Sequence, residues 1–151
     1  MRDRSVDVML LCAIWYDVDS VSIRRLRADG FGVNERARPD SSHAEASLGV
    51  NHNRVAIMAA AGVHPKAVDI GTQPSTFECL AAHILSDIST CLVVVIHDTG
   101  PVTANFFVKI SDILDHLSTF GDPLSLSGDV NIYFERALDT TTIEFINVLE
   151  C

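Results

Sequence analysis

The chain has 151 residues, of which 48% are hydrophobic and 21% are charged, and its net charge at pH 7 is −9. This composition excludes a disordered chain, and the length fits one α/β domain over residues 1–151. No apolar run reaches the roughly 20 residues that a membrane-spanning helix needs. We therefore expect a soluble, acidic protein with no membrane partner.

The charge is unevenly distributed along the chain. Residues 1–66 hold nine Lys or Arg against eight Asp or Glu, whereas residues 67–151 hold two against twelve. An acidic half repels a phosphate backbone. The charge pattern therefore predicts that nucleic acid is not a partner.

The cysteines indicate the redox environment. Cys12, Cys79, Cys91 and Cys151 show no CxxC spacing, and Cys12 and Cys91 lie within apolar runs. A free thiol in such a run behaves as a small hydrophobic side chain. We therefore predict four free cysteines and a reducing, cytoplasmic location.

The first half of the chain begins with an apolar run over residues 6–15, which predicts a buried strand. Residues 20–29 predict a helix, because Gly30 provides a stop signal after them. The polar segment 34–48 predicts a long loop. Residues 51–61 predict a second helix, with Asn51 as its cap.

The central segments repeat this alternation. A short strand is expected over 67–70, followed by a helix over 77–88 that starts at a Ser-x-x-Glu capping box. The uninterrupted β-branched run 92–96 predicts a buried strand. Apolar residues at helical spacing then predict a helix over 103–121, with Thr103 as its cap.

The C-terminal segments leave alternatives open. Residues 130–134 alternate apolar and polar side chains and predict a strand. Residues 142–149 form either a strand paired with it or a final helix capped by Asp139, and three threonines favour the strand. Together the segments predict a three-layer α/β domain with a mostly parallel sheet, helices on both faces and an antiparallel strand pair at the C-terminus.

Ligands of open α/β sheets bind beyond the carboxyl ends of the strands. The residues selected by this rule are Asp17, Asp19, Thr72, His97, Asp98, Thr99 and Gly100. Asp17 and Asp19 could share a Mg²⁺ ion, and with His97 and Asp98 they are the candidate catalytic residues. Thr72, Thr99 and Gly100 are the candidate ligand-binding residues, because hydroxyl and amide groups donate to anions. Alternatively, these residue types simply form turns and caps.

The segment Asp17-Val18-Asp19-Ser20-Val21 resembles the first motif of the haloacid-dehalogenase-like phosphatases. The resemblance implies that the first aspartate is a nucleophile and the second a general acid or base, with Mg²⁺ bound nearby. Thr99 would then match the second motif of that family and Lys109 its lysine. Gly128-Asp129 would match its late acidic motif.

Two functional hypotheses follow. Low aromatic content (7%) and the lack of a complete catalytic set favour a binding or regulatory module that recognises another protein. The alternative is a small enzyme that acts on a phosphate-containing small molecule through an acidic Mg²⁺ site. On the predicted helix over 77–88, one face would carry Cys79, His83 and Asp87. Cys79 and His83 could then form a nucleophile pair or two metal ligands, or the face could simply be solvated.

Overall fold

The computed structural model describes most of the chain, namely residues 7–12, 21–37, 54–72, 74–85, 89–98, 100–136 and 138–150. The described residues form seven strands in two sheets, together with three helices. Sheet A has the strand order β1-β3-β2, and both of its strand pairs are antiparallel. Its strands are β1 (Val8–Leu11), β2 (Gly32–Ala37) and β3 (Arg54–Ala59). Helix α1 (Val21–Ala28) lies between β1 and β2 in the chain.

Sheet B has the strand order β4-β5-β6-β7. Its strands are β4 (His64–Val68), β5 (Glu78–Leu85), β6 (Thr90–His97) and β7 (Leu124–Asp129). The β4–β5 and β5–β6 pairs are antiparallel, and the β6–β7 pair is parallel. A parallel pair needs a crossover connection, which here contains helix α3 (Ala104–Ser118). Helix α4 (Thr140–Glu150) follows β7.

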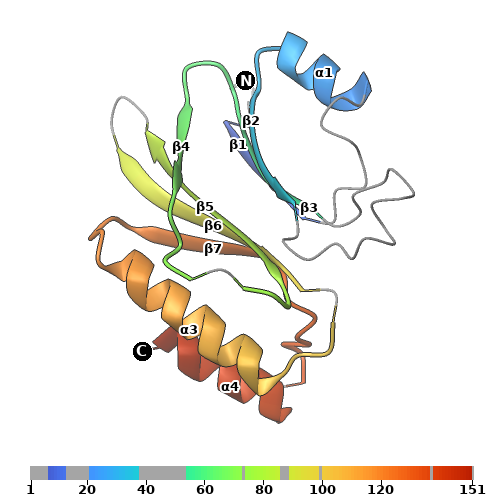
Figure 1. Ribbon diagram of the computed structural model, residues 1–151, viewed down its shortest axis with the longest axis vertical. Helices are drawn as coiled ribbons and strands as arrows, with labels where there is room; N and C mark the ends of the chain where they lie inside the picture. The colour runs from blue at the N-terminus through green and yellow to red at the C-terminus, as the bar shows by residue number, and fades with distance from the viewer. Residues whose placement is uncertain are drawn as a thin grey trace.

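Figure 1 shows the layers, and two apolar cores lie between them. In the inter-sheet core, Val55 and Ile57 of β3 pack with Leu80 of β5 and Val95 of β6. In the helix-side core, alternate residues of β5 and β6 pack against α3 and α4, with Phe106 lying 5.0 Å from Phe77 between ring centroids. Sheet B is therefore covered by sheet A on one face and by α3 and α4 on the other.

The predicted mostly parallel sheet with helices on both faces is wrong. Of the strand pairs described, only β6–β7 is parallel, and the layer opposite α3 and α4 is a second sheet. The error has a physical cause. Strands buried on both faces read as continuous apolar runs whether their neighbours are parallel or antiparallel, so the sequence carried no signal of strand direction.

Two predicted helices are strands. Residues 51–61 contain β3, and residues 77–88 contain β5. In β5, Cys79 faces the helix-side core while Leu80 faces the inter-sheet core, so both faces are apolar. A short run of this kind fits both the two-residue period of a strand and the 3.6-residue period of a helix. Periodicity alone therefore does not show whether it forms a strand or a helix. Cys79 and His83 therefore do not stack on a helix, and Asp87 lies outside the described residues.

The C-terminal prediction is also corrected. The strand occupies Leu124–Asp129 rather than residues 130–134, and residues 140–150 form α4 instead of an antiparallel partner. The carboxylate of Asp139 accepts a hydrogen bond from the backbone amide of Thr141 at 2.9 Å and another from its hydroxyl. This cap supports the helical alternative, which the β-propensity of the threonines concealed.

Several other elements are confirmed. The strand expected over 6–15 contains β1, the helix over 20–29 contains α1, and the run 92–96 lies within β6. The strand expected over 67–70 lies a few residues earlier, as β4, and the helix over 103–121 contains α3. The loop expected over 34–48 is wrong at its start, because residues 34–37 belong to β2, and residues 38–48 lie outside the described ranges.

The cysteines in the described part of the chain, Cys12, Cys79 and Cys91, are free thiols as predicted. Cys151 is not among the described residues. None of the helices described is long and apolar enough to cross a membrane.

Candidate functional site at the ends of β5, β6 and β7

Polar side chains from three strands meet at one end of sheet B. Because β6 and β7 are parallel, their carboxyl ends lie together, and His97 is opposite Asp129 in the register. Strand β5 is antiparallel to β6, so its first residue, Glu78, lies opposite His97 on the other side. The row Glu78–His97–Asp129 thus crosses three neighbouring strands.

The backbone ties the ends of β6 and β7 together beyond this row. The amide nitrogen of Asp98 donates to the carbonyl oxygen of Asp129 at 2.9 Å. The side-chain amide of Asn131 donates to the carbonyl oxygen of Asp98 at 2.7 Å. The carboxylate of Asp129 accepts the backbone amide of Asn131 at 3.1 Å. Asp129 and Asn131 are therefore held in one rigid turn, with Asp129 exposed to solvent.

Two residues of this turn have unusual backbone conformations. Gly128 has φ +137°, and a Cβ atom there would collide with the carbonyl oxygen of Ile96 in β6. Asn131 has φ +52°, a left-handed conformation that Asn adopts more readily than most residues. The Gly-Asp-Val-Asn sequence at 128–131 is thus what allows β7 to approach β6 and then turn sharply.

Glu78 and His97 form a buried pair. Nδ1 of His97 lies 3.1 Å from Oε2 of Glu78, and the two residues are 6% and 4% exposed. An ionised carboxylate only accepts hydrogen bonds, so Nδ1 carries the proton when Glu78 is charged, and Nε2 is the basic nitrogen of the neutral ring. The pair fixes the ring at the sheet end beside Asp129.

Alternation along the strands places this pair on the face towards sheet A. Glu78 and His97 share the orientation of Leu80 and Val95, which belong to the inter-sheet core. Asp98, one residue later, has the orientation of Ile96 and lies towards α3. His97 and Asp98, which are neighbours in the chain, therefore lie on opposite faces of sheet B.

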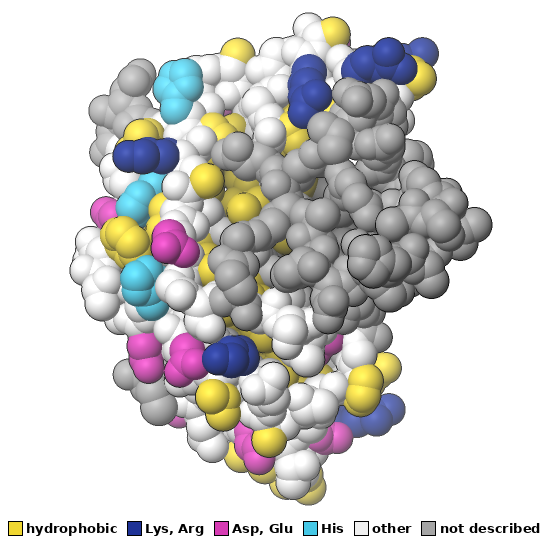
Figure 2. All heavy atoms as spheres, viewed as in Figure 1, with side chains coloured by type: hydrophobic (Ala, Val, Ile, Leu, Met, Phe, Trp, Pro, Cys, Tyr) yellow, Lys and Arg dark blue, Asp and Glu magenta, His cyan; other side chains and the backbone are white. Residues whose placement is uncertain are grey.

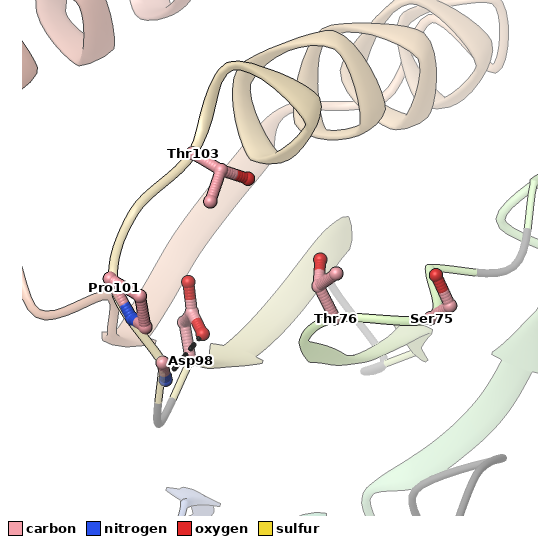
Figure 3. Close-up of a pocket in the computed structure, with 6 residues that line it drawn as sticks. Ser75, Thr76, Asp98, Pro101 and Thr103 are labelled. Atoms are coloured by element: carbon pink, nitrogen blue, oxygen red, sulfur yellow. Dashed lines mark hydrogen bonds between the residues drawn. The ribbon is translucent and has the colours of Figure 1, made fainter.

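A pocket of about 260 Å³ lies on the α3 side of this sheet end (Figure 3). Its lining comes from the segment before β5 and from the connection between β6 and α3: Ser75, Thr76, Asp98, Gly100, Pro101 and Thr103. The carboxylate of Asp98 accepts the backbone amide of Gly100 at 2.9 Å, which shapes the turn. Thr103 is the N-cap of α3 as predicted, but its side chain makes no capping hydrogen bond.

The structure brings together only part of the predicted site. His97, Asp98 and Gly100 lie at the same sheet end, as expected from the strand-end rule. Thr72 contacts Lys109 in the middle of α3, with 3.4 Å between the hydroxyl and Nζ. Asp17, Asp19 and Thr99 lie outside the described residues, so their predicted roles stay predictions.

Three residues of the site were missed or misplaced by sequence reasoning. Glu78 was interpreted as part of a helix capping box, and Asn131 was placed inside a strand. Asp129 entered only through the phosphatase resemblance. The sequence signal for these residues is Gly-Asp-x-Asn at 128–131, at the end of a strand. Glycine and asparagine together are typical of a sharp turn, so this segment indicates a turn that carries polar side chains.

The described residues do not supply a complete metal site by themselves. Among them, no group of three or more His, Cys, Asp or Glu side chains is placed to hold a metal ion. Mg²⁺, however, commonly uses one or two carboxylates together with water and substrate phosphate oxygens. The exposed Asp129 therefore fits the role of a single protein ligand.

The sequence comparisons give no relationship. No protein-family model matches the chain, and no curated protein matches it. The likeness to known proteins lies in the fold.

The fold is similar to that of solved structures of Nocturnin and TDP2. The catalytic domain of human Nocturnin with a bound sulfate anion superposes with a TM-score of 0.59 and 15% identity, over 85% of this chain and 52% of that one. D. rerio TDP2 complexed with a single-strand DNA product gives a TM-score of 0.51 and 15% identity, over 94% and 51%. Truncated Caenorhabditis elegans TDP2 gives 0.54 and 12%, over 85% and 51%. The chain thus spans about half the length of these structures.

The expectation that excluded nucleic acid is wrong. A protein of this fold, D. rerio TDP2, is solved with a single-strand DNA product. Net charge reports the average over the whole surface, whereas binding depends on the local surface around a site. The excess of acidic residues in 67–151 was therefore an insufficient reason for the exclusion.

Proposed function

We propose that this chain is part of an enzyme that hydrolyses phosphodiesters of nucleic acid, with its site at the ends of β5, β6 and β7. The observation that carries the proposal is the row Glu78–His97–Asp129, joined to Asn131, in a fold shared with a catalytic domain that binds sulfate and with TDP2 bound to a DNA product. These likenesses favour the enzyme over the protein-recognition module.

Each residue of the site has a distinct proposed role. Asp129 is exposed and anionic, and would be a ligand of Mg²⁺ together with a phosphate oxygen of the substrate. Mg²⁺ would neutralise charge that develops on the phosphate. The Asn131 side chain positions the turn through its bond to the Asp98 carbonyl oxygen at 2.7 Å. His97, oriented by Glu78, would transfer a proton through Nε2.

The proposed reaction is hydrolysis. Water adds across one P–O ester bond, the bond to the leaving oxygen breaks, and that oxygen takes up a proton. The products are a phosphate monoester and an alcohol. The chain spans about half the length of the structures it matches.

Asp17 and Asp19 are proposed as additional ligands of Mg²⁺. They follow β1, and β1 belongs to the sheet that covers the face where Glu78 and His97 lie. The cytoplasmic location also stays a prediction, from the cysteine pattern.

The test measures Mg²⁺ binding and hydrolysis in the same variants. Mg²⁺ at a hundred times its Kd should stabilise the folded chain by about 2.7 kcal/mol. Asp129→Asn should abolish this stabilisation and lower Mg²⁺-dependent hydrolysis of bis(p-nitrophenyl) phosphate by roughly 100-fold or more. Asp115→Asn is the control, because Asp115 is exposed on α3, outside the row at the strand ends.

Two outcomes would contradict the proposal. One is hydrolysis that persists in Asp129→Asn, and the other is a wild-type chain that neither responds to Mg²⁺ nor cleaves the ester. The same measurement on Asp17→Asn tests whether that carboxylate belongs to the site.

A further inference from the structure

An aromatic–arginine surface, formed by Tyr133, Phe134 and Arg136, follows the candidate site directly in the chain. Asn131 ends the turn after β7, and Ile132 is buried in the helix-side core. Tyr133 and Phe134 then emerge with 53% and 52% of their surface exposed. The surface therefore begins two residues from the end of the proposed site.

This surface is ordered by the backbone and by the core beneath it. The amide nitrogen of Arg136 donates to the carbonyl oxygen of Tyr133 at 2.8 Å, and the hydroxyl of Thr142 donates to the same oxygen at 3.3 Å. The Phe134 ring lies 5.8 Å from the buried ring of Phe145, between centroids. A surface that is already ordered loses little conformational entropy when a ligand binds.

The chemistry of the exposed groups is that of a stacking surface. The guanidinium carbon of Arg136 lies 4.6 Å from the centroid of the Tyr133 ring, a cation–π arrangement. Aromatic rings and arginine planes together bind unpaired bases, at about 1–3 kcal/mol per stacked base. In a duplex the base faces are covered by neighbouring bases, so a stacking surface selects single strands.

The charge of the chain favours bases over phosphates as the source of affinity. On the face that Figure 2 shows, several Lys and Arg side chains gather at the end of the molecule that carries α1, and the other described ones lie apart from one another. Residues 67–151 contain only Lys109 and Arg136 as Lys or Arg. Stacking needs no net positive charge, so it suits an acidic chain better than contacts along a phosphate backbone.

We propose that Tyr133, Phe134 and Arg136 bind an unpaired nucleobase of a single-stranded nucleic acid and thereby bring its adjacent phosphodiester to Asp129 and Asn131. This inference rests on the proposed function and names its substrate class as single-stranded rather than duplex. Binding depends mainly on stacking and only weakly on salt.

The experiment titrates the full chain against a fluorescently labelled single-stranded oligothymidylate, without divalent metal. Tyr133→Ala should weaken binding by about 5-fold to 150-fold, whereas Tyr133→Phe keeps the ring and should bind like the wild type. Phe120→Ala is the matched control, because Phe120 is 43% exposed at the end of α3. The plot of log K against log salt should have a slope no steeper than about −0.7, the value for one phosphate contact with a single strand.

Circular dichroism checks the fold of each variant, and Tyr133→Trp gives a second readout that does not depend on the alanine variant. A base stacked on the new indole should quench fluorescence beyond any quenching of Trp15 in the wild type. The inference is overturned if Tyr133→Ala binds like the wild type, if duplex binds as well as single strand, or if the salt slope matches several phosphates.

The outcomes separate this inference from the proposed function. Binding that depends on Tyr133 without any hydrolysis supports the stacking surface and contradicts the enzyme. Hydrolysis of bis(p-nitrophenyl) phosphate that needs Asp129, with oligonucleotide binding unchanged by Tyr133→Ala, supports the enzyme and overturns the stacking surface.

Discussion

A Cβ atom at Gly128 would collide with the carbonyl oxygen of Ile96, because β7 approaches β6 closely at this point. The backbone of Gly128 also has φ +137°, a conformation that residues with side chains rarely adopt. The contact lies one residue before Asp129, so the close approach of the two backbones sets the position of Asp129 opposite His97 in the register. A side chain at this position would therefore disturb both the sheet and the site.

We expect Gly128→Ala to destabilise the fold by about 3 kcal/mol, because it adds a backbone collision to an unfavourable φ. For a chain of this size the melting temperature should fall by roughly 6–12 °C. Gly121→Ala is the matched control, since Gly121 has φ +72° but no atom within 4 Å of its added Cβ. It should cost about 1 kcal/mol. Equal melting temperatures for the two variants would contradict the close approach.

The buried pair of Glu78 and His97 should contribute to stability as a coupled unit. Glu78→Ala leaves the imidazole buried without this carboxylate partner and should cost about 3 kcal/mol, measured by urea unfolding. Glu78→Gln keeps an acceptor of similar shape and should cost less. In a double-mutant cycle with His97→Ala, the coupling energy should be about 1–3 kcal/mol. Strictly additive effects would show that the two side chains do not interact.

Asp139 should make the stability of α4 depend on pH. The hydroxyl and the backbone amide of Thr141 donate to its carboxylate and hold the pKa of Asp139 below its ordinary value of 3.8. A lowered pKa in the folded state means that the stabilisation is present above pH 3.8 and is lost as the pH falls through the folded pKa. We expect Asp139→Ala to lower the melting temperature at pH 7 and to matter progressively less below pH 3.8.

NMR titration of the Asp139 carboxyl carbon checks the cause of this shift. Thr141→Val removes the hydroxyl donor and should raise the pKa of Asp139 towards 3.8. The backbone amide of Thr141 remains in this variant, so part of the shift should persist. A pKa that does not change in Thr141→Val would contradict the assigned cause.

Thiol counting tests the cysteine prediction over the whole chain, including Cys151. In denaturant without reductant, a thiol-specific reagent should modify four cysteines. In the folded protein Cys79 should react slowest, because it is 2% exposed in the helix-side core. Cys79→Ala should remove the slow phase. Fewer than four reactive thiols after denaturation would reveal a disulfide and remove the argument for a reducing compartment.

Part of the fold was predictable because some signals are local. The helix that became α3 was visible from its apolar stripe, and the strand β6 from its β-branched run. The strand-end rule selected His97 and Asp98, and both lie where the carboxyl ends of β6 and β7 meet, although the sheet is mostly antiparallel. The rule holds there because β6 and β7 are themselves parallel, so their carboxyl ends meet. The roles of His97 and Asp98 in a site stay predictions.

By itself, the sequence determined which residues are apolar, where α1 and α3 form, and that polar groups follow β6. Only the tertiary structure decided that residues 78–85 are a strand. A strand that is buried on both faces has no alternation of apolar and polar residues, so its sequence does not differ from that of a buried helix. The tertiary structure also decided that Glu78 meets His97 across 19 residues and that Asn131 meets Asp98 across 33. Such pairings depend on strand order and direction, which arise from packing two sheets and a helical layer together rather than from any local pattern of residues.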